Sequence, residues 1–302
     1  MLLSYSEFIR KSLYGQSGYY RKNQRRIGFS HRTDFYTASS VPLFGKLLGA
    51  AFTTLKEIHH LENPTLVELG NEPDSPVFLE GCPGFGASLN FPLDALTRKN
   101  HWKSPAVVFC NELFDALPFD RFVRRKGIWR ILGLDADKKI MDLEMGKAPA
   151  EDAKFLGDRF PDGATVDISP EAPLLIERLP EWTGLFVIFD YGLTLSQLLE
   201  RPRPTGRAYH KHRLLSLGEA LSLKAGEYDI THHVMWDLIA GALRKRGFSV
   251  ATPTSQESFF VKHASGIFPT LSSIERKQLS ELIHPSNMGQ SFEIMVASRS
   301  DR

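Results

Sequence analysis

The stretch from Ala106 to Pro118, AVVFCNELFDALP, decides how the rest of the chain is interpreted. Its apolar start, which runs through Phe109, is typical of a strand buried on both faces inside a parallel sheet. Asn111, Glu112 and Asp115 follow at its carboxyl end, the edge where open α/β sheets bind ligands. Two interpretations stay open at this point. Either Asn111 or Asp115 caps a following helix, or the polar side chains form a site.

Two other segments have the same form, an apolar run that ends in an acid and a glycine. Residues 65–70 read TLVELG, and residues 185–192 read LFVIFDYG. Three buried strands of this kind, separated by segments with helical periodicity, predict an α/β fold with a doubly wound sheet. Glu68, Asn111 and Asp190 would then lie along one edge of that sheet.

The chain divides into an N-terminal helical segment, residues 1–62, and a core, residues 63–302. Ser4 and Glu7 form a capping-box pattern that predicts a first helix, and a second helix is expected from about Pro42 to Leu61. We expect the N-terminal segment to contribute to a site on the core.

Two insertions are expected within the core. Residues 119–168 alternate polar and apolar positions with turn signals between them, which indicates a small antiparallel meander. Residues 193–228 are polar and rich in proline, and we expect a loop or lid over the sheet edge. The next segment, 229–247, predicts one helix with basic residues in its last turn, and 291–297 predicts a closing strand.

Composition excludes several classes of function. The 302 residues include 37 basic and 35 acidic ones, so the net charge of +2 lacks the basic excess of most nucleic-acid-binding proteins. The two cysteines have no spacing typical of a disulfide framework or a zinc site. No apolar stretch approaches the roughly 18 residues of a spanning helix. We therefore expect a cytoplasmic protein with no membrane span and no nucleic-acid partner.

The residues that most often carry hydrolytic or metal chemistry are not suitably placed. His232 and His233 are adjacent, and neighbouring residues on a helix point about 100° apart, so they cannot both face one ion. No serine lies in a G-x-S-x-G motif. We expect neither a metal site nor a nucleophilic triad.

Two turns that contain glycine could belong to a site. A nucleotide-binding turn normally has several glycines, whereas Gly70 is followed by NEPD, so the residues alone favour a plain turn from strand to loop. After the third apolar run, Tyr191 could stack on a ligand or donate a hydrogen bond to it. Alternatively, Asp190 and Tyr191 begin a helix with the aromatic ring packed on it.

Several motifs, in a fixed order, are similar to those of the MidA-like family of S-adenosylmethionine (SAM) dependent methyltransferases. They are the GYY...DFYT...FG segment with Asp34, Phe35, Tyr36 and Thr37; Cys110 to Pro118; Asp190-Tyr191-Gly192; Arg207-Ala208-Tyr209 with His212; Asp229-Ile230-Thr231 with His233; Gln256 with Phe259; and Met288-Gly289 with Phe292. The mitochondrial member of that family helps to assemble respiratory complex I by methylating an arginine.

The resemblance implies a Rossmann-like, SAM-binding sheet with an antiparallel final strand and a smaller added subdomain. It implies a cofactor site made of Asp34, Phe35, Tyr36, Thr37, Glu68, Gly70 and Asn111. The catalytic residues that it implies are Glu112, Asn111, Asp115, Asp190, Tyr191 and His233. Glu112 is expected to hold the guanidinium of an arginine acceptor, because a carboxylate matches its planar fork.

The chain departs from the family pattern at the cofactor turn. The family's ELGxGxG motif keeps only Gly70 of its three glycines, and about 40 residues separate Gly70 from Asn111. One βαβ unit takes about 30 residues or more, so we expect a shortened cofactor-binding half. The leading hypothesis is a methyltransferase that acts on a protein side chain such as arginine. The alternatives are an inactive interaction or assembly protein with a degenerate SAM site, and a binder of another nucleotide-like ligand.

Overall fold

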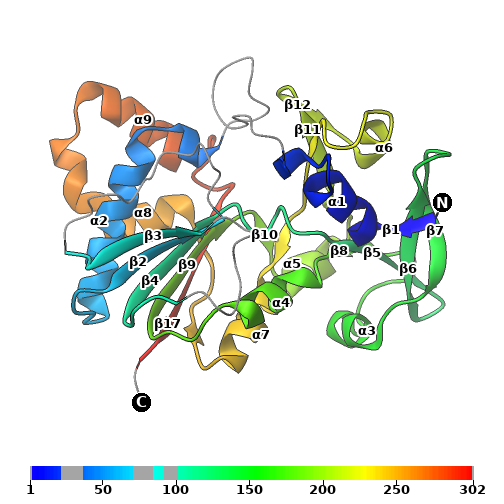
Figure 1. Ribbon diagram of the computed structural model, residues 1–302, viewed down its shortest axis with the longest axis horizontal. Helices are drawn as coiled ribbons and strands as arrows, with labels where there is room; N and C mark the ends of the chain where they lie inside the picture. The colour runs from blue at the N-terminus through cyan, green and yellow to red at the C-terminus, as the bar shows by residue number, and fades with distance from the viewer. Residues whose placement is uncertain (1, 22–36, 71–83, 92–100, 301–302) are drawn as a thin grey trace.

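The computed structural model describes residues 2–21, 37–70, 84–91 and 101–300. It has a large mixed sheet with helices on both faces, next to a second body made mainly of antiparallel strands (Figure 1). Within the described residues, no helix has both the length and the apolar character that crossing a membrane requires.

The large sheet has parallel strands at its centre. In spatial order its strands are β15 (Ser249–Val250), β17 (Glu293–Arg299), β9 (Gly184–Asp190), β4 (Ala106–Asn111), β2 (Thr65–Leu69) and β3 (Ala87–Phe91), and β16 (Thr254–Ser255) also pairs with β17. Strands β3, β2, β4 and β9 are parallel to one another, and β17 is antiparallel to β9. This arrangement confirms the predicted α/β fold and its antiparallel final strand.

The three apolar runs of the sequence form the middle of this sheet. Val107 and Phe109 of β4 pack toward one layer of helices, and Val108 and Cys110 pack toward the other. A strand that is covered on both faces has no solvent-facing position, which explains why these runs are continuously apolar.

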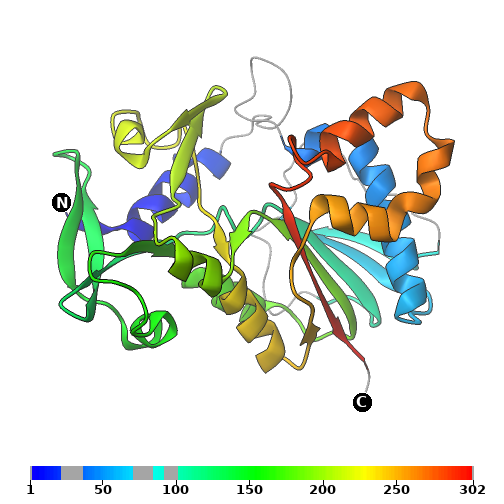
Figure 2. The same ribbon diagram turned by 180° about the vertical axis from the view of Figure 1, so that it is seen from behind.

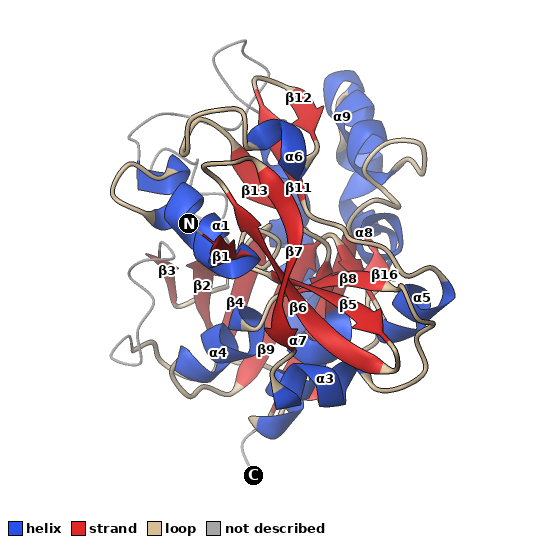
Figure 3. Cartoon of the chain, turned by 90° about the vertical axis from the view of Figure 1, so that its right-hand side faces the viewer, coloured by secondary structure: helices blue, strands red, loops and turns tan. Residues whose placement is uncertain are grey.

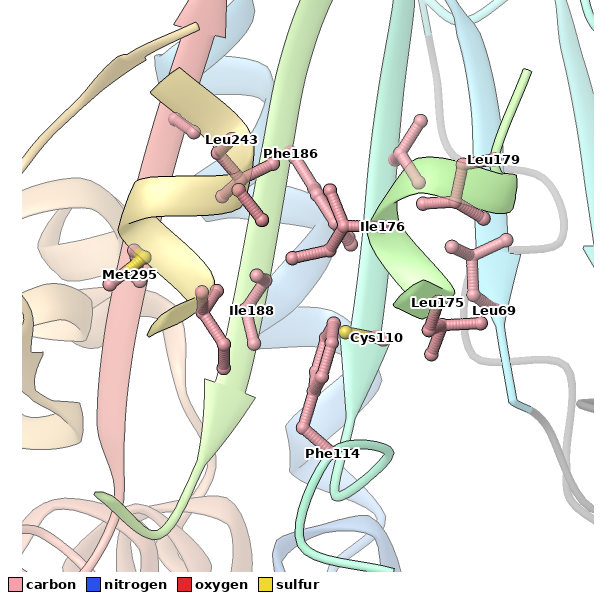
Figure 4. Close-up of a cluster of buried hydrophobic side chains, with 14 of the residues drawn as sticks. Leu69, Cys110, Phe114, Leu175, Ile176, Leu179, Phe186, Ile188, Leu243 and Met295 are labelled. Carbon is pink, nitrogen blue, oxygen red and sulfur yellow. The ribbon is translucent and has the colours of Figure 1, made fainter. Parts of the chain in front are cut away.

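Helices cover both faces of the large sheet. One layer consists of α2 (Leu43–Ile58), α8 (Gln256–Ala264) and α9 (Ser273–Ile283), with the 3-10 helices η2 (Ala38–Ser40) and η4 (Ser265–Thr270) nearby (Figure 2). The other layer contains α4 (Glu171–Arg178) and α7 (Trp236–Lys245). Figure 4 shows Ile176 of α4 and Leu243 of α7 over Phe186 of β9.

The second body contains a smaller antiparallel sheet, which faces the viewer in Figure 3. Its strands are β1 (Leu2–Ser4), β6 (Ile128–Asp135), β5 (Asp120–Arg125) and β8 (Thr165–Ile168) in spatial order, with β7 (Ile140–Lys147) paired to β6 and α3 (Ala150–Leu156) between β7 and β8 in the chain. Strands β5 to β8 account for the meander expected over residues 119–168, and β1 joins them from the N-terminus.

The N-terminal residues divide between the two bodies. Helix α1 (Tyr5–Tyr14) begins at the capping box of Ser4 and Glu7, and its apolar face packs on the small sheet together with η1 (Tyr19–Arg21). Helix α2 packs on the large sheet instead. The first 62 residues therefore contribute to both bodies.

Two expectations about secondary structure were wrong. Residues 193–228 were expected to be a loop or lid without regular structure, but they contain α5 (Leu195–Glu200), the hairpin β11 (Arg207–His210) and β12 (Arg213–Leu215), and α6 (Leu217–Ala220). Residues 229–235 were expected to start a helix, but they form β13 (Asp229–Thr231) and β14 (Val234–Met235), and α7 begins only at Trp236. The β-branched Ile230 and Thr231 pair with β11, and β14 pairs with β10 (Gly192–Leu193), so strand partners distant in sequence override the helical pattern.

Candidate functional site

The turn that follows β4 places the central acid of the site. Glu112 has a φ of +50°, which is uncommon for a residue with a side chain. Its backbone N–H donates to the carbonyl of Phe189 at 2.9 Å, so the turn is joined to the neighbouring strand β9. Residues held in this conformation cluster at functional sites.

Asp190, at the end of β9, holds this turn through hydrogen bonds to its backbone. Its Oδ2 accepts the backbone N–H groups of Phe114, at 3.0 Å, and Asp115, at 3.3 Å. Its Oδ1 accepts the N–H of Tyr191 at 2.8 Å. Asp190 is fully buried, and its pKa is raised by burial and by the neighbouring Asp115. The geometry thus gives Asp190 a supporting role in the predicted site.

The Glu112 carboxyl accepts two side-chain hydrogen bonds. Asn111 Nδ2 donates to Oε1 at 2.9 Å, and the Thr37 hydroxyl is the second donor. Burial raises the pKa of Glu112 well above its ordinary value, and the charge of Asp115 raises it further, whereas the two hydrogen bonds lower it. Asn111 Oδ1 is buried and has no hydrogen-bond partner among the described residues. This acceptor is available to a bound group.

Asp115 is buried close to Glu112. Burial raises the pKa of its carboxyl to about 7, although the charge of Arg207 opposes that rise. The backbone carbonyl of Asp115 accepts both the N–H of His232, at 3.1 Å, and its ring Nδ1–H, at 2.9 Å. The carbonyl can only accept, so Nδ1 of His232 carries the proton. The pKa of His232 is lowered to about 4 by burial.

Arg207 belongs to the same group of side chains, although sequence reasoning did not assign it to the site. Its guanidinium carbon lies 5.5 Å from the ring centroid of Tyr191 and 5.7 Å from that of Tyr209. These distances suit cation–π attraction. Arg207 opens the RAY motif that resembles the family pattern, and that match was the available signal.

Tyr191 joins the site to the large sheet. Its ring lies 4.1 Å from that of Phe292, centroid to centroid, and its carbonyl accepts the N–H of Val234 at 2.8 Å. Burial raises the pKa of the Tyr191 hydroxyl, and the charges of Glu112 and Asp115 raise it further. The phenol therefore stays protonated and can act as a hydrogen-bond donor.

His233 is partly buried beside Arg207. Its backbone N–H donates to Thr205 Oγ1 at 3.1 Å, and its buried ring Nδ1 has no hydrogen-bond partner in the part of the chain that the structure describes. The pKa of His233 is lowered to about 4, mainly by burial and also by the charges of Arg207, His232 and Arg203. The ring is therefore neutral near pH 7.

Glu68 lies on β2, directly beside β4, and Gly70 follows the last residue of that strand. Glu68 is 6% exposed, and burial raises its pKa to about 7. Glu68 Oε2 lies 3.2 Å from the side-chain amide of Asn90 in β3, which can donate to it once the amide group is turned over. Gly70 has a φ of +78°, and a Cβ there would lie 2.6 Å from Cδ1 of Leu113. The position after β2 therefore favours glycine, because of its backbone conformation and because Leu113, in the turn after β4, packs directly against it.

The structure brings most of the predicted site residues together at one edge. Thr37, Asn111, Glu112, Asp115, Tyr191 and His233 converge there, with Glu68 on the next strand and Gly70 directly after that strand. Asp34, Phe35 and Tyr36 lie outside the described residues. Among the residues that are described, no cluster of three His, Cys, Asp or Glu side chains could hold a metal ion.

Comparison with known proteins identifies the family. In fold, the chain is similar to a COG1565 superfamily member from Burkholderia thailandensis bound to S-adenosyl-homocysteine, with 20% identity over 99% of this chain and 88% of that one and a TM-score of 0.81. The native structure of a COG1565 superfamily protein from the same organism is similar as well. It has 19% identity over 99% of this chain and 87% of that one, with a TM-score of 0.77. A search of curated proteins finds no match. A family model described as "Putative S-adenosyl-L-methionine-dependent methyltransferase" matches residues 54–254, more than half of the sequence, and the chain therefore belongs to this methyltransferase family.

Proposed function

We propose that the chain is a MidA-like methyltransferase that acts on a protein side chain, with arginine as the acceptor. The observation that carries this proposal is the Glu112 carboxyl, which is oriented by Asn111 and Thr37 at the carboxyl edge of the sheet. Within the part of the chain that the structure describes, the strongest influences on its pKa include no cation, whereas the charge of Arg207 acts on Asp115. Glu112 is therefore the acid best placed to receive a cationic substrate.

The residues around this acid fit the family's cofactor. When bound, SAM supplies an electrophilic methyl group on a positively charged sulfur. The unpartnered Asn111 Oδ1 would accept a hydrogen bond from it, because a buried acceptor without a partner carries a desolvation penalty. Glu68 and Gly70, at the end of the adjacent strand, would complete the cofactor side. Thr37 links that side to the acceptor side through its hydrogen bond to Glu112.

Glu112 would act on the acceptor in two ways. Its two oxygens match the fork of a guanidinium, which holds the acceptor nitrogen in one orientation. The nitrogen loses one proton when its new bond to carbon forms, and the carboxylate can accept that proton. The raised pKa of Glu112 strengthens it as a base, and an incoming cation would favour its ionised form.

A second candidate function is a non-catalytic interaction protein with a degenerate SAM site. Leu113 packs directly against Gly70, and the sequence places NEPD where the family has further glycines. Among the described residues, β3 is the last strand on this side of the sheet. Such a protein would retain the acceptor side of the site without binding the cofactor.

Calorimetric titration with SAM and with S-adenosyl-homocysteine separates the two candidates. The enzyme should bind both ligands, whereas an absence of heat at millimolar ligand would favour the interaction protein. Transfer of a labelled methyl group to arginine-containing peptides, followed by amino-acid analysis, then identifies the acceptor.

The Glu112→Gln variant tests the role assigned to the acid. We expect near-normal affinity for S-adenosyl-homocysteine and a fall in methyl transfer of about 100-fold or more, because the amide can neither pair with a guanidinium nor accept its proton. Glu144→Gln is the matched control, since Glu144 pairs with Arg125 and Arg130 on the small sheet. If cofactor affinity and transfer fell equally in Glu112→Gln, the acceptor role of Glu112 would be refuted.

A further inference from the structure

A buried carboxylate of the small sheet, Asp167, reaches the segment that carries Arg207 to the site. Its Oδ1 accepts Arg121 Nε at 2.7 Å, and its Oδ2 accepts a second guanidinium nitrogen of Arg121 at 3.0 Å. The same Oδ2 accepts the backbone N–H groups of Thr205, at 2.8 Å, and Gly206, at 2.7 Å. The side chain of Asp167 has no exposed area. Four donors thus converge on one buried acid.

The segment held by Asp167 leads directly into the site. Thr205 Oγ1 accepts the backbone N–H of His233, and Arg207 begins β11, where it pairs with Thr231. Gly206 packs closely against Phe119 and Asp167. A Cβ at this position would lie 2.3 Å from the Phe119 ring and 3.1 Å from Asp167 Oδ2. The segment therefore has little freedom to move while Asp167 holds it.

We propose that Asp167 is a positioning residue: by anchoring Thr205 and Gly206, it sets the guanidinium of Arg207 against Asp115 and His233. Any effect of this placement on catalysis rests on the proposed function. The placement itself can be tested without cofactor or substrate. In this proposal the small sheet has a function, which is to hold charged side chains at the edge of the large sheet.

A purely structural ion pair is the alternative explanation of the Asp167 contacts. Removing one partner of a buried pair destabilises a protein strongly wherever the pair lies, because the other charge stays buried without a partner. Loss of stability therefore cannot distinguish the two explanations. A readout that reports the position of Arg207 is needed, and His233 provides one.

The ring of His233 is faced by Arg207 from β11, by its neighbour His232, and by Arg203, and all three lower its pKa. NMR titration of the imidazole signals, assigned with His233→Gln, measures this pKa. In Arg207→Gln we expect it to rise by about one unit from its value of about 4, because a nearby positive charge is lost. In Asp167→Asn we expect a similar rise as Arg207 moves away.

The sign of the change in Asp167→Asn is informative. Loss of a negative charge can by itself only lower the pKa of an imidazole, so a rise requires movement of the segment. If that movement acts through Arg207, Asp167→Asn should add no further rise in an Arg207→Gln background, whereas simple exposure of the ring would add to it. Asp142→Asn is the matched control, because Asp142 also contacts Arg121, at 3.4 Å, but does not bond to Thr205 or Gly206. The His233 pKa should not change in that control.

Gly206→Ala repeats the test without any change of charge, and it decides the matter if Asp167→Asn does not fold. The added methyl group should push the segment away from Phe119 and Asp167, and the pKa of His233 should rise. A His233 pKa that stays constant or falls in Asp167→Asn, or that stays constant in Gly206→Ala or Arg207→Gln, would overturn the proposal. Binding of S-adenosyl-homocysteine is measured separately, so failure of the proposed function would not be confused with failure of this inference.

Discussion

At the scale of single residues, the acids of this edge differ in what surrounds them. Glu68 has a pKa of about 7 because of burial alone, whereas Glu112 combines burial, a neighbouring acid and two hydrogen-bond donors. A buried carboxyl with a raised pKa destabilises the folded state once it must ionise. Such residues are maintained at a cost to stability.

The Glu68→Gln variant should reveal this cost through its pH dependence. The pKa of Glu68 rises from 4.5 to about 7 on folding, so its contribution to stability is fully present below pH 4.5 and is lost as the pH rises through 7. Glutamine does not ionise, so the variant does not lose this stability as the pH rises. Relative to the wild type, its free energy of unfolding should therefore increase by up to about 3 kcal/mol between pH 4.5 and 8.

Urea unfolding at several pH values measures this difference. Glu219→Gln serves as the control, because hydrogen bonds to the backbone and side chain of Ser216 lower the pKa of the exposed Glu219, which gives a slope of opposite sign. A difference between Glu68→Gln and the wild type that does not change with pH would contradict the assigned pKa.

The Gly70→Ala variant tests the end of β2. A residue with a side chain is strained at a φ of +78°, and the new Cβ would also lie 2.6 Å from Leu113. We expect a loss of about 1–3 kcal/mol in the free energy of unfolding. In Gly241→Ala, within α7, a methyl group meets nothing within 4 Å and should stabilise the protein by up to about 1 kcal/mol. Equal effects at the two glycines would show that the close approach of Leu113 has no energetic consequence.

At the scale of elements, the turn after β4 is held by several parts of the chain. Asp190 bonds to it from β9, His232 bonds to the Asp115 carbonyl, and the Tyr14 hydroxyl of α1 donates to the Ala116 carbonyl at 2.8 Å. A short turn makes few bonds of its own. Its conformation therefore depends on elements of both bodies.

The Asp190→Asn variant tests this support. The amide has one acceptor oxygen in place of two, and its NH₂ group would face a backbone donor, so we expect a loss of about 1–3 kcal/mol. Hydrogen exchange at Phe114 and Asp115 should become faster. Asp237→Asn is the control, since Asp237 accepts one backbone N–H, from Leu195 at 2.7 Å, at an exposed position. Unchanged exchange at Phe114 and Asp115 would mean that Asp190 does not hold the turn.

At the scale of the whole molecule, α1 packs against the small sheet, and the small sheet in turn contacts the segment that leads to the site. Ile9→Ala should cost about 2–5 kcal/mol, because Ile9 is fully buried between α1 and that sheet. Hydrogen exchange should accelerate in β5, β11 and β13, while β4 and β9 keep their protection. Equal loss of protection in both sheets would instead indicate a single cooperative unit.

Particular segments show which elements could be predicted from the sequence and which could not. The strands β2, β4 and β9 and the helix α2 were predicted because each has a strong apolar pattern of its own. The segment at 229–235 was misread as helix, because its strand partners in β11 and β10 are remote in sequence. Arg207 was not assigned to the site, since nothing near it in the chain marks it as a neighbour of Asp115.

By itself, the sequence determined that AVVFCNELFDALP forms a buried strand with polar residues at its end, because a continuous apolar run can only be covered on both faces. The motifs also indicated the methyltransferase family. Only the tertiary structure decided which side chains meet there. Thr37 donates a hydrogen bond to Glu112, Asp190 accepts the backbone N–H of Phe114, and Asp167 accepts the N–H of Thr205, two residues before Arg207. Those contacts join residues far apart in the chain, and local patterns carry no information about such distances.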